Sequence, residues 1–97
     1  MAKFIMLPEA KSDIKEASKW YDKKQIKLGK AFRNEVKLIT AYIQQYPEGF
    51  EIKYNHFRGC IVNRFPYIVF YRMHQDTIVI VAVLADKQNR EEILSER

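Results

Sequence analysis

The sequence lacks the features that mark disulfide-rich, metal-binding or membrane proteins. Cys60 is the only cysteine, so an intramolecular disulfide is impossible and a cysteine-based zinc site is not expected. The two histidines have no cysteine partners and make a poor metal site. The longest apolar run, from Ile78 to Ala85, has the length of a strand and is too short to span a membrane. We therefore expect no metal, no cofactor and no membrane partner, and a cytoplasmic protein.

Linkers and common catalytic motifs are also missing. The chain has only three glycines and three prolines. No Gly/Ser-rich or Pro-rich stretch marks a linker, and there is no glycine-rich phosphate loop or Ser-His-Asp pattern. The apolar segment near the N-terminus is too short for a signal peptide. A length of 97 residues predicts one domain that covers residues 1–97.

Aromatic rings and positive charge are the features that the chain does have. Hydrophobic residues make up 47% and aromatic residues 13% of the sequence, which is enough for a packed core in a short chain. The formal net charge is +5. Such a charge attracts nucleic acid, an anionic surface or an acidic protein, although small domains also carry it for solubility alone.

The first half of the sequence has helical periodicity. Lys3 to Leu7 predicts a short strand, and Pro8 suits the first turn of a following helix. That helix has an apolar stripe, which predicts a face in the core. A separate stripe of lysines at spacings of four predicts a face in water and consists of Lys11, Lys15, Lys19 and Lys23. A break at residues 24–29 precedes a second helix that Pro47 ends. Its apolar stripe is Phe32, Val36, Ile39, Ile43 and Tyr46.

The second half of the sequence is typical of strands. Three segments are rich in β-branched and aromatic residues: Cys60–Asn63, Tyr67–Met73 and Thr77–Leu84. The last is continuously apolar, which predicts a strand covered on both faces. The tail from Asp86 to Arg97 is polar and charged, and Ile93 and Leu94 within it could dock a last helical turn. The fold class is therefore α+β: an N-terminal strand, an αα-hairpin, then a three-stranded, mostly antiparallel sheet with the hairpin on one face.

Several motifs, in this order and spacing, give the chain a family likeness. The most specific are Trp20-Tyr21 ahead of Leu28-Gly29, and Arg64-Phe65-Pro66-Tyr67 leading to Tyr71. With Leu7, Ala10, Asp13, Pro47 and the Asp76–Val83 segment, the pattern covers nearly the whole chain. It resembles the RelE/ParE toxin superfamily of type II toxin–antitoxin systems, and is closer to the ParE branch. The likeness implies the same α+β fold and a gene-paired antitoxin.

The superfamily acts in two ways, and the sequence departs from one of them. Some members cleave mRNA in the ribosomal A site, and others poison DNA gyrase. In the nuclease register, Gly59 and Ile61 occupy positions where a pair of lysines would be expected, and Ile68 occupies that of an arginine. RNA cleavage needs groups that move protons and cations that hold the phosphorane charge. The absence of these cationic side chains favours a protein that acts by binding and not by catalysis.

Six polar side chains are nevertheless candidates for function. If the chain is a nuclease, the candidate catalytic residues are Arg58, Arg64, Tyr67, Tyr71 and Arg90. The candidate target-binding residues are Arg58, Arg64, Arg90 and Arg97, because a guanidinium binds phosphate or carboxylate in a bidentate manner. Four of them have a structural alternative: Arg58 and Arg64 could pair with Glu51, Asp76 or a helix end, and the two tyrosines could pack in the core.

Three functions follow as hypotheses. The leading one is a toxin that inhibits DNA gyrase by direct contact, arrests growth, stabilises a plasmid and is neutralised by its antitoxin. The second is a ribosome-dependent mRNA endonuclease, and the third is an inactive or orphan module that only binds an antitoxin. We favour a protein that is not an enzyme. We expect the antitoxin and either gyrase or the ribosome with mRNA as partners, and no sequence-specific DNA binding without the antitoxin.

Overall fold

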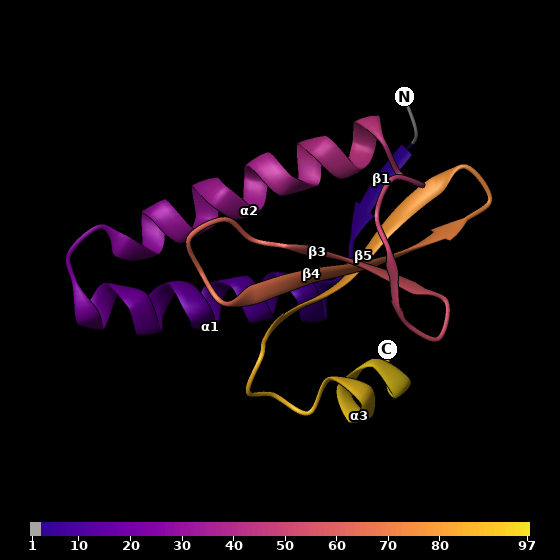
Figure 1. Cartoon of the computed structure of the whole chain (residues 1–97). Coiled ribbons are helices and arrows are strands. Elements are labelled where there is room, and N and C mark those ends of the chain that lie inside the picture. The colour runs from indigo at the N-terminus through magenta and orange to yellow at the C-terminus, as the bar shows by residue number, and fades with distance from the viewer. Residues whose placement is uncertain (1–2) are drawn as a thin grey trace.

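The structure, a computed structural model, describes residues 3–97 and has three helices and five strands in that range. The fold class is α+β, as predicted from the order of helical and strand patterns. Figure 1 shows the chain from its first strand, through the helical hairpin, to the C-terminal helix. The elements are β1 Lys3–Met6, α1 Pro8–Lys24, α2 Leu28–Gln45, β2 Ile52–Tyr54, β3 Phe57–Ile61, β4 Tyr67–His74, β5 Thr77–Ala85 and α3 Arg90–Ser95.

The sheet has five strands, in the order β1-β5-β4-β3-β2, so the prediction of three was wrong in number. β1 pairs in parallel with β5, and the other neighbours are antiparallel. The sequence predicted a strand at Lys3–Leu7 but gave no sign that it would join the sheet of the second half. β2 has only three residues, which is too short for a clear alternation of apolar and polar side chains.

The α1–α2 hairpin packs on one face of the sheet (Figure 1). Its apolar stripes meet side chains of β3, β4 and β5 in the larger core cluster, which includes Phe32, Val36, Tyr71 and Ile80. The two helices come very close at Gly29, where an added Cβ would lie 2.4 Å from the carbonyl oxygen of Ser18. Glycine is therefore required there for the hairpin to close.

A smaller core cluster lies on the opposite face of the sheet. Leu94 of α3, with 1% of its surface exposed, packs against side chains that include Ile68 and Phe70 of β4 and Val79 of β5. Every residue from Ile78 to Leu84 is buried. The continuous apolar run thus forms a strand covered on both faces, as predicted.

A β-bulge changes the course of β5 halfway along its length. Tyr71 pairs with Ile80 and Phe70 pairs with Ala82, so Val81 is an extra residue in β5. β1 ends at the same level, since Met6 pairs with Ile80. The outer edge of β5 beyond the bulge therefore has no strand beside it, and it faces α1.

Candidate functional site

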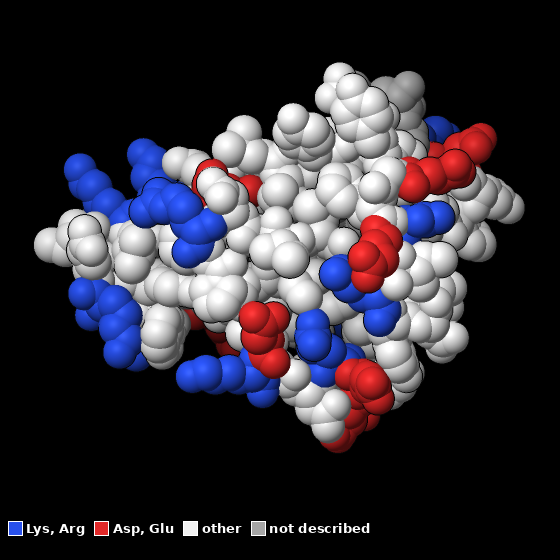
Figure 2. Space-filling view, in the orientation of Figure 1, with Lys and Arg blue, Asp and Glu red and all other residues white. Residues whose placement is uncertain are grey.

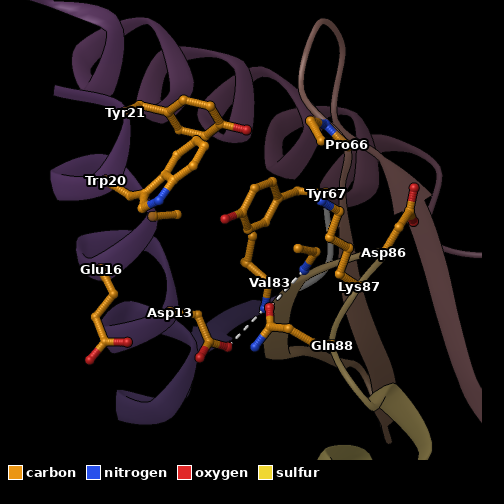
Figure 3. Close-up of a pocket in the computed structure, with 12 residues that line it drawn as sticks. Asp13, Glu16, Trp20, Tyr21, Pro66, Tyr67, Val83, Asp86, Lys87 and Gln88 are labelled. Carbon is orange, nitrogen blue, oxygen red and sulfur yellow. Dashed lines mark hydrogen bonds between the residues drawn. The ribbon is translucent and has the colours of Figure 1, made fainter. Parts of the chain in front are cut away.

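A groove of about 520 Å³ lies between α1 and the outer edge of β5. Figure 3 shows the side chains of α1 on one side of it and those of β4, β5 and the following loop on the other. The lining is partly apolar and aromatic, and it carries three carboxylates and one lysine. The residues are Asp13, Glu16, Ala17, Trp20, Tyr21, Pro66, Tyr67, Val83, Ala85, Asp86, Lys87 and Gln88.

In this groove, side chains and not a neighbouring strand accept hydrogen bonds from the backbone N–H groups at the edge of β5. The backbone N–H of Val83 donates to Oδ2 of Asp13 over 3.0 Å. The backbone N–H of Ala85 donates to Oε1 of Gln88 over 2.8 Å. Residues 83 and 85 point the same way along the strand, so these two N–H groups present the hydrogen-bonding pattern of a sheet edge. The groove therefore offers a place where an extended peptide could pair.

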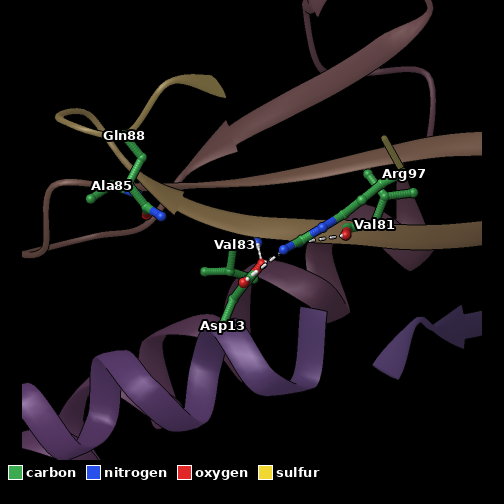
Figure 4. A network of polar contacts seen from close by, with 6 residues as sticks. All are labelled: Asp13, Val81, Val83, Ala85, Gln88 and Arg97. Atoms are coloured by element: carbon green, nitrogen blue, oxygen red, sulfur yellow. Dashed lines mark hydrogen bonds and ion pairs between the residues drawn. The ribbon is translucent and has the colours of Figure 1, made fainter. Parts of the chain in front are cut away.

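A partly buried ion pair includes Asp13 of the groove. The guanidinium of Arg97 donates two hydrogen bonds to the carboxylate of Asp13, the longer of them 3.1 Å from Nη2 to Oδ1. Arg97 also donates to the carbonyl oxygen of Val81, in the bulge, over 3.1 Å (Figure 4). The hydrogen bonding of Arg97 to the carboxylate of Asp13 is the main reason that the pKa of Arg97 is raised. One side-chain pair thus links α1, the β5 bulge and the C-terminal residue.

Three aromatic rings form the apolar side of the groove. Trp20 is 52% exposed, and its ring meets that of Tyr21 edge-on with centroids 5.0 Å apart. The hydroxyl groups of Tyr21 and Tyr67 point toward the groove (Figure 3). Burial, followed by the neighbouring Tyr67, raises the pKa of Tyr21. Burial, followed by the charge of Asp13, raises the pKa of Tyr67, so both hydroxyls stay protonated and can donate hydrogen bonds at neutral pH.

Two of the candidate residues from the sequence lie side by side but are held by backbone groups. Arg58 and Tyr71 face each other on β3 and β4. The guanidinium of Arg58 donates to the carbonyl oxygen of Phe50 over 2.6 Å. The hydroxyl of Tyr71, whose side chain is fully buried, donates to the carbonyl oxygen of Pro47 over 2.6 Å. Tyr71 therefore packs in the core, which is the structural alternative for this residue.

The remaining candidates are dispersed. Arg64 lies in the turn before β4 with a φ of 74°, and its guanidinium lies over the ring of Phe65 at 5.5 Å, not beside a carboxylate. Tyr67 shares a face of the sheet with Tyr71, but it lies at the other end of that stretch of β4, where it lines the groove. Arg90 begins α3 and is half-buried. The structure therefore places Arg58 beside Tyr71, but it does not bring the six candidate residues together in one site.

Sequence reasoning identified Tyr67 as a candidate but missed the polar side chains that bind the edge of β5 in the groove. Asp13 was noted only as part of the family pattern, although it lies between Ala10 and Ala17 on the apolar side of its helix. A carboxylate at such a position needs a partner, and that was the available signal. Nothing in the sequence pointed to Gln88, because its contact with Ala85 depends on the path of the loop.

Within residues 3–97, no helix combines the length and the apolar character needed to cross a membrane. In the same range, no three or more His, Cys, Asp or Glu side chains are grouped so that they could hold a metal ion.

Comparisons with known proteins agree with the fold and the order of motifs. A solved structure described as the chromosomal ParDE TA system from P. aeruginosa superposes with a TM-score of 0.79. It covers 88% of this chain and 96% of the other at 15% identity, which shows a shared fold. Comparison with curated proteins gave no match. The sequence model of the family described as the ParE toxin of type II toxin-antitoxin system, parDE, matches residues 4–90, and the chain therefore belongs to the ParE toxin family.

Proposed function

We propose that this toxin inhibits DNA gyrase by direct binding in the cytoplasm, and that a cognate antitoxin neutralises it. The family match over residues 4–90 supports a type II toxin. The placement of the candidate residues supports binding in preference to catalysis. Arg58, Tyr71 and Arg97 all use their polar groups to hold the fold, so they are not free to act on RNA.

Two of the three positions that depart from the nuclease pattern, Gly59 and Ile68, have packing roles, whereas the third, Ile61, is 63% exposed. Gly59 is buried in β3, where an added Cβ would lie 2.7 Å from a side-chain carbon of Lys53 and 3.0 Å from one of Ile68. Ile68 is 5% exposed and packs in the smaller core cluster. A lysine or arginine at either place would put a charge into an apolar interior at a high cost. The packing of the sheet depends on Gly59 and Ile68, which favours a toxin that acts by binding its target and not by cleaving RNA.

The α1–β5 groove is the observation that carries the antitoxin part of the proposal. We infer that an extended segment of the antitoxin pairs with the outer edge of β5 beyond the bulge and replaces the Gln88 cap on Ala85. Apolar side chains of that segment would contact the exposed ring of Trp20 and the ring of Tyr67. Basic side chains would meet Glu16 and Asp86 at the rim.

A supercoiling assay tests the gyrase target. Purified toxin added to gyrase and relaxed plasmid should abolish supercoiling in a dose-dependent manner, and prior addition of the antitoxin should restore it. Unchanged supercoiling at a large molar excess of toxin would contradict the proposal. Primer extension on translated mRNA distinguishes the alternative, since cuts linked to codons would indicate a ribosome-dependent nuclease.

A binding experiment tests the antitoxin site. The product of the adjacent open reading frame should co-purify with the toxin. Trp20→Ala should weaken that complex at least about tenfold, because a half-exposed aromatic anchor is the type of residue that dominates an interface. Tyr42→Ala on α2 is the matched control, since Tyr42 is 59% exposed and lies outside the groove. Equal losses in both variants would exclude the groove as the docking site.

A further inference from the structure

The positive charge of this protein is concentrated at one end of the helical hairpin. Residues 19–34 contain six cations and one carboxylate, a formal charge of +5 that equals the charge of the whole chain. The other residues therefore sum to zero. Figure 2 shows Lys and Arg side chains gathered where α1 passes to α2. The cations, all exposed, are Lys19, Lys23, Lys24, Lys27, Lys30 and Arg33, and we call them the basic tip.

The fold does not neutralise the basic tip. The two ion pairs within residues 3–97 are Asp13 with Arg97 and Glu51 with Lys53, neither of which involves the tip. Asp22, the one carboxylate in the segment, accepts a hydrogen bond from the backbone N–H of Gly29 over 2.8 Å and closes the hairpin. Six exposed positive charges held close together repel one another, a cost that an external polyanion would relieve.

The basic surface continues from the tip along the seam between α1 and α2. A groove of about 350 Å³ has four cations in its lining, Lys11, Lys15 and Lys19 of α1 and Arg33 of α2, and one carboxylate, that of Asp22. Residues four apart on a helix rise by about 6 Å, so the row from Lys11 to Lys23 is about 18 Å long. Roughly ten phosphate charges lie along that length of duplex DNA. The row and the tip together thus match an extended polyanion better than a single small anion.

The exposed ring nearest the tip, that of Trp20, lines the α1–β5 groove and not the seam between α1 and α2. Nζ of Lys24 lies 4.8 Å from the centroid of the Trp20 ring, and Tyr21 meets the same ring edge-on. No ring lines the seam groove. Proteins that bind single-stranded nucleic acid stack bases on free aromatic faces, whereas contacts with the backbone of a duplex need only cations. These features favour a duplex.

We propose that the basic tip and the α1–α2 seam bind the sugar–phosphate backbone of duplex DNA without sequence preference. The choice of DNA rests on the proposed function, because gyrase holds duplex DNA and a toxin bound to it would lie beside that DNA. The expected site is separate from the α1–β5 groove, on other sides of the same helix. The hairpin would then add affinity for the gyrase–DNA complex over free gyrase.

Fluorescence anisotropy with a labelled 20-base-pair duplex and the purified full chain tests this directly. Binding should weaken steeply with salt, with a slope of log K against log salt concentration between about −3.6 and −5.4, as expected for four to six phosphate contacts. Two unrelated duplex sequences should bind alike. Because no gyrase is present, this experiment can fail while gyrase inhibition holds, and it can succeed if gyrase is not the target.

A pair of charge-matched variants locates the contact. Lys23→Gln with Lys30→Gln should raise the Kd at least about tenfold and reduce the salt slope by about 2. Both residues are exposed on helices, and glutamine has nearly the same helix propensity as lysine. Lys3→Gln with Lys53→Gln removes the same charge from exposed strand positions and should change the Kd less than twofold.

Four results would overturn the proposal. These are no binding to the duplex at 50 mM salt, equal losses in the two double variants, tighter binding to a single-stranded oligonucleotide of the same length, and binding to vesicles with anionic lipid in preference to DNA. Equal losses in the two double variants would show that net charge, and not the position of the lysines, determines binding. The last two would assign the basic tip to a different polyanion.

Discussion

Helix α1 has two solvent-facing sides that differ in chemistry and in how the fold uses them. On the side toward β5, Asp13 and Trp20 border a groove, and Asp13 is paired with Arg97. On the side toward α2, Lys15 and Lys19 border a groove whose cations make no ion pair within residues 3–97. A charge that is paired inside a fold supports stability, whereas an exposed unpaired one remains free for a partner. We therefore expect loss of the Asp13–Arg97 pair to lower stability, and loss of the exposed lysines on the other side to weaken binding of a polyanion.

The largest loss of stability should follow from breaking the Asp13–Arg97 pair. Arg97→Ala leaves the carboxylate of Asp13, whose side chain is only 14% exposed, without its cation and removes a contact that anchors the C-terminus. We expect a loss of about 3 kcal/mol in the free energy of unfolding, measured by urea denaturation. Lys53→Ala, which removes an exposed pair with a 3.7 Å separation, should cost less than about 1 kcal/mol. Equal effects would remove the contrast between the two sides.

A second test concerns the close contact that sets the shape of the hairpin. Gly29→Ala places a Cβ against the backbone oxygen of Ser18, which can move only if the helices separate. We expect a loss of about 2 kcal/mol in urea denaturation. Gly49→Ala is the control, because its nearest neighbours, both atoms of Tyr46, lie 3.3 Å away, and it should cost below about 1 kcal/mol. A neutral Gly29→Ala would mean that the connection at the basic tip is loose.

Alkaline pH provides a third test, within the core that supports both sides. Burial raises the pKa of Tyr71 from 10.0 to about 12. The folded chain therefore holds this proton more tightly than the unfolded chain. The stabilisation that comes from this difference in pKa is complete below pH 10 and is lost as the pH rises from 10 to 12. The loss is about 2–3 kcal/mol in the free energy of unfolding.

Tyr71→Phe should separate this contribution from those of Tyr21 and Tyr67, whose pKa values are also raised. The variant should be less stable by about 1 kcal/mol at pH 7, because the carbonyl oxygen of Pro47 loses its donor. It should also lose less stability between pH 10 and 12. Urea denaturation at pH 8, 10 and 11.5 measures both effects, with the exposed Tyr42→Phe as control. Identical pH profiles for Tyr71→Phe and the parent would contradict the assignment.

The smallest effect on stability should come from the basic tip. Lys23→Gln with Lys30→Gln should change the free energy of unfolding by no more than about 0.5 kcal/mol, since exposed side chains without partners contribute little. A small gain is expected at low salt, where repulsion among the six cations is strongest. Thermal unfolding at 20 mM and 200 mM salt checks this. A loss above 1 kcal/mol would show that these lysines hold the fold.

Some elements could be predicted from the sequence because their signals are local. Pro8 set the start of α1, Pro47 lay just past the end of α2, and the apolar run from Ile78 to Leu84 predicted a strand buried on both faces. The lysines at spacings of four predicted a basic side of α1. The parallel pairing of β1 with β5 and the short β2 could not be predicted in the same way, because a pairing partner is not written into a strand's own residues.

For the candidate site, too, some features follow from the residues alone and others only from the packing of the elements. The sequence by itself determined the fold class, the toxin family likeness and the concentration of charge in residues 19–34, since each depends on residue types and spacings along the chain. The tertiary structure alone decided that Arg97 would reach Asp13 and that Tyr71 would be buried against Pro47. It also decided that β1 would end where β5 bulges and leave an open sheet edge. These contacts join residues 24 to 84 positions apart, and only the packing of helices on the sheet brings such residues within hydrogen-bonding distance.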